Sequence, residues 1–100
     1  MEKKVPSHNL EAIKATFSHI NKLRMSSTAL RTAREMGFSR EDMVNTIQQL
    51  KRKDFVKSMT TYNDHKIWQD VYNTQFNAYV LYVKFQKDSE GYFIISFKKK

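Results

Sequence analysis

The chain has 100 residues, enough for one domain spanning residues 1–100 around one modest core, and its formal net charge is +8 at pH 7. It contains no cysteine, so disulfides, thiolate metal sites and cysteine nucleophiles are excluded. It also lacks an apolar run long enough to span a membrane and an apolar N-terminal signal region, so we expect a cytoplasmic protein with no membrane partner.

The first half of the chain has the spacing of three amphipathic helices, because apolar residues recur every three or four positions. The three stripes are Leu10, Ile13, Phe17 and Ile20, then Leu30, Ala33 and Met36, then Met43, Val44, Ile47 and Leu50. Ser7 or Asn9 can cap the first helix. Gly37 is placed to end the second, and Ser39 with Asp42 resembles a capping box for the third.

Two further segments are expected to be extended. Residues 1–6 are charged and end in a proline, which indicates a flexible or extended arm. Residues 22–25 alternate over a short span, which indicates a brief extended segment between the first two helices.

The second half alternates with the period of two that is typical of strands. We expect four strands, over residues 55–62, 67–72, 78–85 and 92–98. They are separated by a polar turn at residues 63–66, a polar connection at 73–77, and a loop in which Gly91 supplies the turn.

The same alternation predicts which side chains face the helices. The inward face of the last two strands is expected to hold Tyr79, Leu81, Val83, Phe85, Phe93, Ile95 and Phe97. The outward face is expected to hold Tyr82, Lys84, Ser96 and Lys98. Lys57 is expected to share a face with Phe55 and Met59, and Trp68, which alternates away from Gln69, is expected in the core.

Three helices followed by four strands predict an α+β fold, an antiparallel sheet with about three N-terminal helices packed on one face. The other face is expected to be open, basic and aromatic. A charge of +8 implies a polyanionic partner, and 13% of the residues are aromatic. Because phosphates bind Lys and Arg while bases stack on aromatic rings, this combination favours a nucleic acid.

The usual catalytic signatures are missing. The sequence has no Gly-rich phosphate loop, no nucleophile elbow and no His-x-x-x-His spacing. Asp64 and Asp70 are not spaced as a metal-binding pair, so a metal nuclease is disfavoured and no cofactor is expected. RNA cleavage without a metal needs fewer groups from the protein, because RNA supplies its own 2′-OH nucleophile. Lys, Arg, Tyr and Gln side chains can align this hydroxyl, transfer protons and neutralise the charge on the phosphoryl oxygens.

Three blocks, at residues 57–62, 64–65 and 67–72, read Lys-Ser-Met-Thr-Thr-Tyr, Asp-His and Ile-Trp-Gln-Asp-Val-Tyr. Together with the opening Met-Glu-Lys and the closing Ser-Phe-Lys, they closely resemble the motility quorum-sensing regulator (MqsR) family, over essentially the whole chain. The resemblance implies a RelE-like fold and a bacterial toxin that cuts messenger RNA at GC-containing sites such as GCU. It also implies a cognate antitoxin, expected to be a zinc-binding helix-turn-helix repressor, which silences the toxin and recruits it to operator DNA.

The resemblance places four active-site residues in this chain: Lys57, Gln69, Tyr82 and Lys98. Lys98 would bind the scissile phosphate and steady its developing charge. Tyr82 would transfer a proton or orient the substrate by stacking, and Lys57 would be the general base or a second phosphate ligand. Gln69 would orient the 2′-OH or a base edge.

Three more residues are candidate RNA contacts: Met59, Lys84 and His65. Met59 shares the face of Lys57 and could pad a base, while His65 either touches RNA or stabilises the turn. Clustering of Lys57, Lys84 and Lys98 is expected to lower lysine pKa values by like-charge repulsion. A lysine or tyrosine base then predicts a cleavage rate that rises between about pH 7 and 9.

One stretch departs from the family pattern. Similar toxins carry a basic, proline-containing stretch where this chain has Asn-Thr-Gln at residues 73–75, so substrate preference or affinity is expected to differ. The basic end over residues 98–100 could compensate for the lost charge.

Two other functions fit the same residues. A non-catalytic nucleic-acid-binding regulatory module would use the same basic, aromatic face and would bind RNA with steep salt dependence, without cutting it. A protein whose charge matches an acidic partner would have no RNA affinity at physiological salt. Only an endoribonuclease predicts strand scission that is lost in Lys98→Ala.

Overall fold

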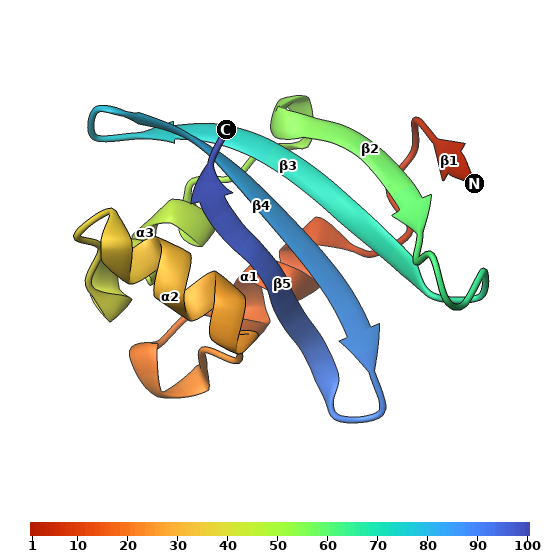
Figure 1. Ribbon diagram of the computed structural model, residues 1–100, viewed down its shortest axis with the longest axis horizontal. Helices are drawn as coiled ribbons and strands as arrows, with labels where there is room; N and C mark the ends of the chain where they lie inside the picture. The colour runs from red at the N-terminus through yellow and green to blue at the C-terminus, as the bar shows by residue number, and fades with distance from the viewer.

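The sheet has five strands in chain order, and every neighbouring pair is antiparallel. The computed structural model describes residues 1–100, and its strands are β1 (Glu2–Lys3), β2 (Phe55–Thr60), β3 (Trp68–Phe76), β4 (Tyr79–Asp88) and β5 (Gly91–Lys99). Figure 1 shows β2 to β5 crossing the molecule side by side, with β1 beyond β2. The predicted α+β class is confirmed, and the additional strand, β1, forms from the N-terminal arm.

Three α-helices precede the long strands: α1 (Leu10–Thr16), α2 (Ser27–Glu35) and α3 (Arg40–Gln48). The side chains that cap their first turns belong to Asn9, Ser26 and Ser39. Ser39 and Asp42 form the predicted capping box, and Gly37 follows α2 with a φ of 82°, a conformation that favours glycine. The first helix is shorter than predicted, because Ile20 lies in a separate 3-10 turn, η1 (Ile20–Lys22).

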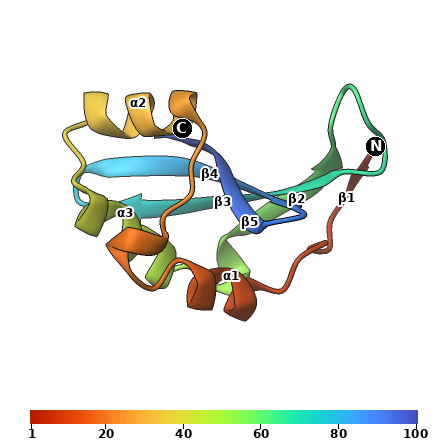
Figure 2. The same ribbon diagram turned by 90° about the horizontal axis from the view of Figure 1, so that it is seen from below.

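Helices α1 and α3 cover one face of the sheet, and α2 lies along its edge strand, β5, where Thr32 Oγ1 donates to the Phe97 carbonyl at 2.6 Å. The hydrophobic core lies between these helices and the sheet. Its members from the helical half are Ile13, Phe17, Ala29, Ala33, Phe38, Met43, Ile47 and Leu50, and those from the sheet are Tyr72, Leu81, Val83, Phe85, Ile94 and Phe97. Figure 2 shows α2 and α3 at the end of the molecule away from β1. No helix combines the length and the apolar character needed to cross a membrane.

A β-bulge reverses the predicted orientation of the first part of β5. The β4–β5 register shifts between Lys84 and Phe85, so Ile95 has no cross-strand partner in β4. As a result Ile94 is fully buried in the core, whereas Phe93 and Ile95 are only half-buried. The inward-face prediction is right for β4 and for the end of β5, and it is wrong for Phe93 and Ile95.

A second bulge lies in β2, between Phe55 and Lys57. Phe55 packs against the core, with its ring centroid 5.5 Å from that of Tyr72, while Lys57 pairs with Val71 and faces the other way. The predicted shared face of Phe55 and Lys57 is therefore wrong, because the extra residue changes the phase of the alternation.

Strand β3 is longer than predicted. Residues 73–76 continue its pairing with β4, and Gln49 from the end of α3 donates to Thr74 Oγ1 at 2.8 Å, so the predicted polar connection is wrong. Trp68, which begins β3, is half-exposed and lies outside the core, contrary to its prediction. The Lys3 Nζ lies 4.2 Å from the centroid of the Trp68 ring, so Trp68 is covered by the N-terminal arm and not by a helix.

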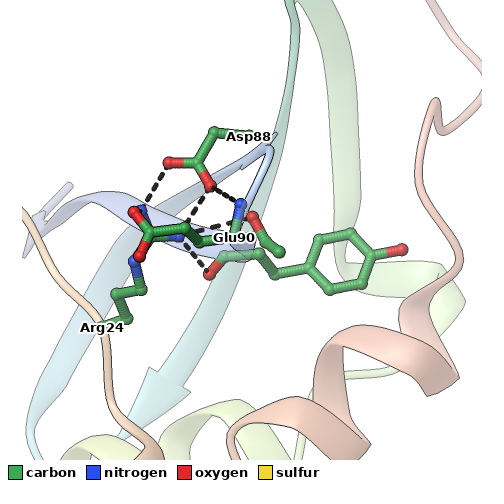
Figure 3. Close-up of polar contacts among 5 residues, drawn as sticks. Arg24, Asp88 and Glu90 are labelled. Carbon is green, nitrogen blue, oxygen red and sulfur yellow. Dashed lines mark hydrogen bonds and ion pairs between the residues drawn. The ribbon is translucent and has the colours of Figure 1, made fainter.

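The tip of the β4–β5 hairpin is held by Arg24, which precedes α2 (Figure 3). Arg24 Nη1 donates to Asp88 Oδ1 at 2.9 Å, and its Nη2 faces the carboxylates of Asp88 and Glu90. The guanidinium also lies 4.8 Å from the centroid of the Phe93 ring. Met25 forms a bridge with β5, which confirms the end of the brief extended segment predicted at residues 22–25, whereas Lys22 lies in η1.

The N-terminal arm is fixed by Asp70 of β3, which is fully buried. Its carboxylate accepts hydrogen bonds from the backbone N–H groups of Ser7, at 3.0 and 3.1 Å, and His8, at 2.9 Å. It also accepts one from Ser58 Oγ at 2.6 Å. The arm is therefore extended, and β1 places Glu2 beside β2.

Candidate active site

The sheet face opposite the helices, called here the open face, carries a cluster of cationic and polar side chains. One row across the strands consists of Lys57, Val71, Lys84 and Ser96, and the next row consists of Asn73, Tyr82 and Lys98. Side chains that are directly opposite on neighbouring strands have Cβ atoms about 5 Å apart. The pairing therefore brings together what we call the lysine–tyrosine cluster, Lys57, Tyr82, Lys84 and Lys98.

Lys98 and Tyr82 are cross-strand partners near the C-terminal end of β5. The Lys98 Nζ lies 5.1 Å from the centroid of the Tyr82 ring, which is the geometry of a cation–π contact. Lys98 is exposed and Tyr82 is half-buried. The ammonium group is therefore available to an anion, and the phenol is held beside it.

Lys57 is paired with Glu2 of β1, with its Nζ 2.9 Å from Glu2 Oε1. The hydrogen bond and the charge of Glu2 raise the pKa of Lys57, and Lys57 lowers the pKa of Glu2 in return. The predicted lowering of the Lys57 pKa is therefore wrong, because the carboxylate outweighs the neighbouring lysines. Both side chains are partly exposed, so a competing anion can displace Glu2.

Lys84 has a different environment at the centre of the cluster. It is half-buried and stands opposite Val71, a residue of the open face that is fully buried. Burial, followed by the charges of Lys98 and Lys57, lowers the pKa of Lys84. Here the predicted lowering by clustered lysines is confirmed, with desolvation as the larger cause.

Gln69 lies on the same face but further from Tyr82 and Lys98. It is cross-strand to Met59, and its Nε2 donates to Gln86 Oε1 at 2.7 Å. Four residues of strand separate the row of Gln86 from the row of Tyr82, which is about 13 Å. Gln69 and Met59 are therefore placed to meet a different part of an extended ligand than Lys98 does.

His65 does not join the cluster. It is exposed in the loop between β2 and β3, which Figure 2 shows beside β1 at the end of the molecule away from α2 and α3. The hydrogen bonds of this loop are made by Thr61 and Asp64: Asp64 N donates to Thr61 Oγ1 at 3.0 Å, and Lys66 N to Asp64 Oδ1 at 2.8 Å. The alternative in which His65 stabilises the turn is not supported by these bonds.

Sequence reasoning missed Glu2, Gln86 and Asn73. Glu2 and Gln86 fix the side chains of Lys57 and Gln69, and their partners are 55 and 17 positions away in the chain. Asn73, interpreted as part of a loop, lies opposite Tyr82, and its Oδ1 is buried without a hydrogen-bond partner. The hydrogen-bonding capacity of Asn and Gln side chains was the one available signal that these residues could belong to the site. Which side chains they meet is known only once the strands are paired.

The open face has the chemistry to bind and cleave a phosphodiester chain. Its cations can hold phosphoryl oxygens, and the amine of Lys84 and the phenol of Tyr82 can move protons. The four surface hollows of the molecule lie elsewhere, around the helices and the ends of the strands, so the open face suits a polymer lying across it. No three His, Cys, Asp or Glu side chains gather as a set of metal ligands.

Comparison with known proteins agrees with the resemblance noted in the sequence. A family model described as "Motility quorum-sensing regulator, toxin of MqsA" matches residues 5–99. The "mRNA interferase toxin MqsR" of Escherichia coli (strain K12) is 39% identical over 100 residues, which cover 100% of both chains. Matches of this extent establish that the chain belongs to the motility quorum-sensing regulator (MqsR) toxin family.

Proposed function

We propose that this protein is the toxin of a bacterial type II toxin–antitoxin pair and an endoribonuclease that cuts messenger RNA, which arrests translation and growth. The observation that carries the proposal is the lysine–tyrosine cluster, which gathers three lysines and a phenol on the open face. Membership of a toxin family that includes an mRNA interferase supports the choice of substrate. A cytoplasmic location follows from that substrate.

The cleavage proceeds without a metal ion, by attack of the 2′-oxygen on the neighbouring phosphorus. A bond forms between O2′ and phosphorus, the bond from phosphorus to O5′ breaks, and the products are a 2′,3′-cyclic phosphate and a 5′-OH. Lys98 and Lys57 bind the phosphoryl oxygens and stabilise the charge that builds there. The pairing of Lys57 with Glu2 supports this role, because it keeps Lys57 protonated until a phosphate replaces the carboxylate.

Tyr82 donates the proton that the leaving 5′-oxygen needs, since its phenol stands beside Lys98, in the row next to that of Lys57 and Lys84. Gln69 contacts a nucleotide next to the cut, through the amide that Gln86 holds in place. Met59 packs against the base of that nucleotide, and Lys84 lies at the reacting phosphate. His65 touches RNA only where the bound strand extends to the β2–β3 loop.

Preference for GC-containing sites such as GCU, and silencing by a cognate antitoxin, are part of the proposal. Their support is the family membership, whose description names the toxin together with a second protein, MqsA. The antitoxin is expected to be a zinc-binding helix-turn-helix repressor that connects the toxin to operator DNA.

The test is incubation of the purified protein with an RNA that contains several GCU sites, in excess chelator, with analysis of the product ends. Discrete cuts that leave 2′,3′-cyclic phosphate and 5′-OH are expected. A matched RNA with a 2′-deoxynucleotide on the 5′ side of one site should resist cleavage at that site alone. Tight, salt-sensitive binding without any cut would instead identify a regulatory RNA-binding module.

A further inference from the structure

The three lysines of the cluster differ in what they can do with a proton. Lys57 has a carboxylate partner 2.9 Å from its Nζ. Lys98 is exposed at the end of β5 and rests on the Tyr82 ring. Lys84 is half-buried, and in contrast to Lys57 it has neither a carboxylate partner nor a hydrogen bond.

The groups that face Lys84 come from every strand of the sheet. The cations are Lys57 of β2 and Lys98 of β5, the neutral neighbours are Val71, Ser96 and Tyr82, and the carboxylate of Glu2 on β1 is bonded to Lys57. A cation in this position is surrounded by like charge and by apolar surface. Both effects favour the neutral amine, in agreement with the lowered pKa of Lys84.

We propose that Lys84 is the residue that accepts the proton of the attacking 2′-OH, and that Lys57 acts only as a cation. This inference rests on the proposed RNA cleavage. As the bond from O2′ to phosphorus forms, the proton of that hydroxyl passes to the neutral Nζ of Lys84. As the bond to O5′ breaks, the phenol of Tyr82 supplies a proton to the leaving oxygen, so Lys84 and Tyr82 carry out the proton transfers of the step.

The position of Lys84 suits this role. It shares a row with Lys57 and is next to the row of Lys98, so a phosphate held by both ammonium groups lies over Lys84. Fully buried Val71 forms the floor of the site beside it and keeps water from one side of the amine. An amine with few competing water molecules and a lowered pKa is a stronger candidate base at neutral pH than an ordinary lysine.

The test compares Lys84→Arg with Lys57→Arg in single-turnover cleavage across the pH range in which the wild-type rate rises. Arginine keeps the positive charge and does not give up its proton at these pH values. Lys84→Arg should lower kcat/KM by about 100-fold or more and remove its rise with pH, because kcat/KM reports the base of the free protein. Lys57→Arg keeps a cation at the phosphate and should retain the rise of kcat/KM with pH, even where the rate itself falls. An unchanged pH profile in Lys84→Arg overturns the assignment.

A direct titration gives a second, independent readout. The lysine amines can be dimethylated with a ¹³C label and followed by NMR as the pH is raised, with single Lys→Arg variants assigning the signals. Lys84 should titrate below Lys57, and a Lys84 that titrates at or above Lys57 would overturn the proposal. A wild-type protein that leaves RNA intact would overturn the proposed function itself, whereas cleavage with an unaltered profile in Lys84→Arg removes only the role of Lys84.

Discussion

The hairpin tip around Arg24 and the lysine–tyrosine cluster both gather charge, but only the hairpin tip balances it. At the tip, one guanidinium faces the carboxylates of Asp88 and Glu90 (Figure 3) and also lies over the ring of Phe93 in β5. In the cluster, three lysine side chains share one carboxylate, that of Glu2, and a neighbouring amide oxygen of Asn73 is buried without a partner. The first arrangement is complete in the free protein, and the second becomes complete only when an anion binds.

The difference separates structural charge from functional charge on one small surface. An unpaired cation or buried polar atom costs stability, so a sheet face that keeps several of them is a candidate binding site. The following four predictions test this distinction, in order of decreasing effect.

The largest effect is expected for Lys98→Ala. Removal of a cation that stabilises the developing phosphoryl charge should lower the cleavage rate by about 10²- to 10³-fold. Lys99→Ala is the matched control, because Lys99 pairs with Leu81 on the opposite face and carries the same charge. Single-turnover cleavage of one RNA by both variants measures the effect, and equal losses in the two would mean that net charge alone is responsible.

Asn73→Leu should stabilise the fold by about 1 kcal/mol, because it replaces a buried, unpaired amide oxygen with an apolar group of similar size. Urea unfolding of the variant and the wild type gives the difference. Gln75→Leu, two residues further along the same strand and exposed, is the control and should change stability little. A less stable Asn73→Leu would show that the Asn73 amide is satisfied in solution.

Glu2→Gln should strengthen RNA binding by up to about fivefold, since the carboxylate that competes with phosphate for Lys57 is lost. The pKa of Lys57 should also fall, because its raised value depends first on Glu2. Fluorescence anisotropy with a non-cleavable 2′-deoxy oligonucleotide measures the affinity. Glu11→Gln changes the charge equally on α1, away from the open face, and should leave the affinity closer to that of the wild type.

The smallest effect is expected for Asp88→Asn, at the balanced hairpin tip. The hydrogen bond from Arg24 holds the pKa of Asp88 below its ordinary value of 3.8. When folding lowers the pKa of a carboxyl group, the group stabilises the fold at pH values above its pKa in the unfolded chain. This stabilisation is lost as the pH falls through the pKa of the folded state. Thermal unfolding should therefore show a lower midpoint for the variant at pH 7 and no difference well below pH 3.8, with RNA cleavage unchanged. A change in cleavage at low temperature would contradict the structural role.

Local features of the fold were predictable from the sequence, because they depend on residues close in the chain. The capping box of Ser39 and Asp42 and the turn at Gly37 are examples, and so is the alternation that places Tyr82 and Lys84 outward on β4. Pairing between distant segments was not predictable. The amino-acid sequences of β2 and β5 do not reveal the bulges. Phe93 was therefore predicted on the wrong face of the sheet, and Phe55 was wrongly predicted to share a face with Lys57.

The candidate site shows the same limit. The residue types of the site were recognised through the family resemblance, but their environments come from side chains far away in the sequence. Glu2 reverses the expected pKa shift of Lys57, and burial against the sheet makes Lys84 the lysine whose pKa falls. A residue's chemistry depends on its neighbours, and a single sequence does not place those neighbours in space.

The anchoring of the arm by Asp70 sets an order for folding on the ribosome. The amides of Ser7 and His8 leave the ribosome first, yet the carboxylate that binds them is synthesised 62 to 63 residues later. Contacts with such long sequence separation close large loops and form late. Nascent chains therefore carry an undocked arm until β2 and β3 have paired. During that interval Lys57 has no counter-ion, and the open face is at its most basic while messenger RNA is close by.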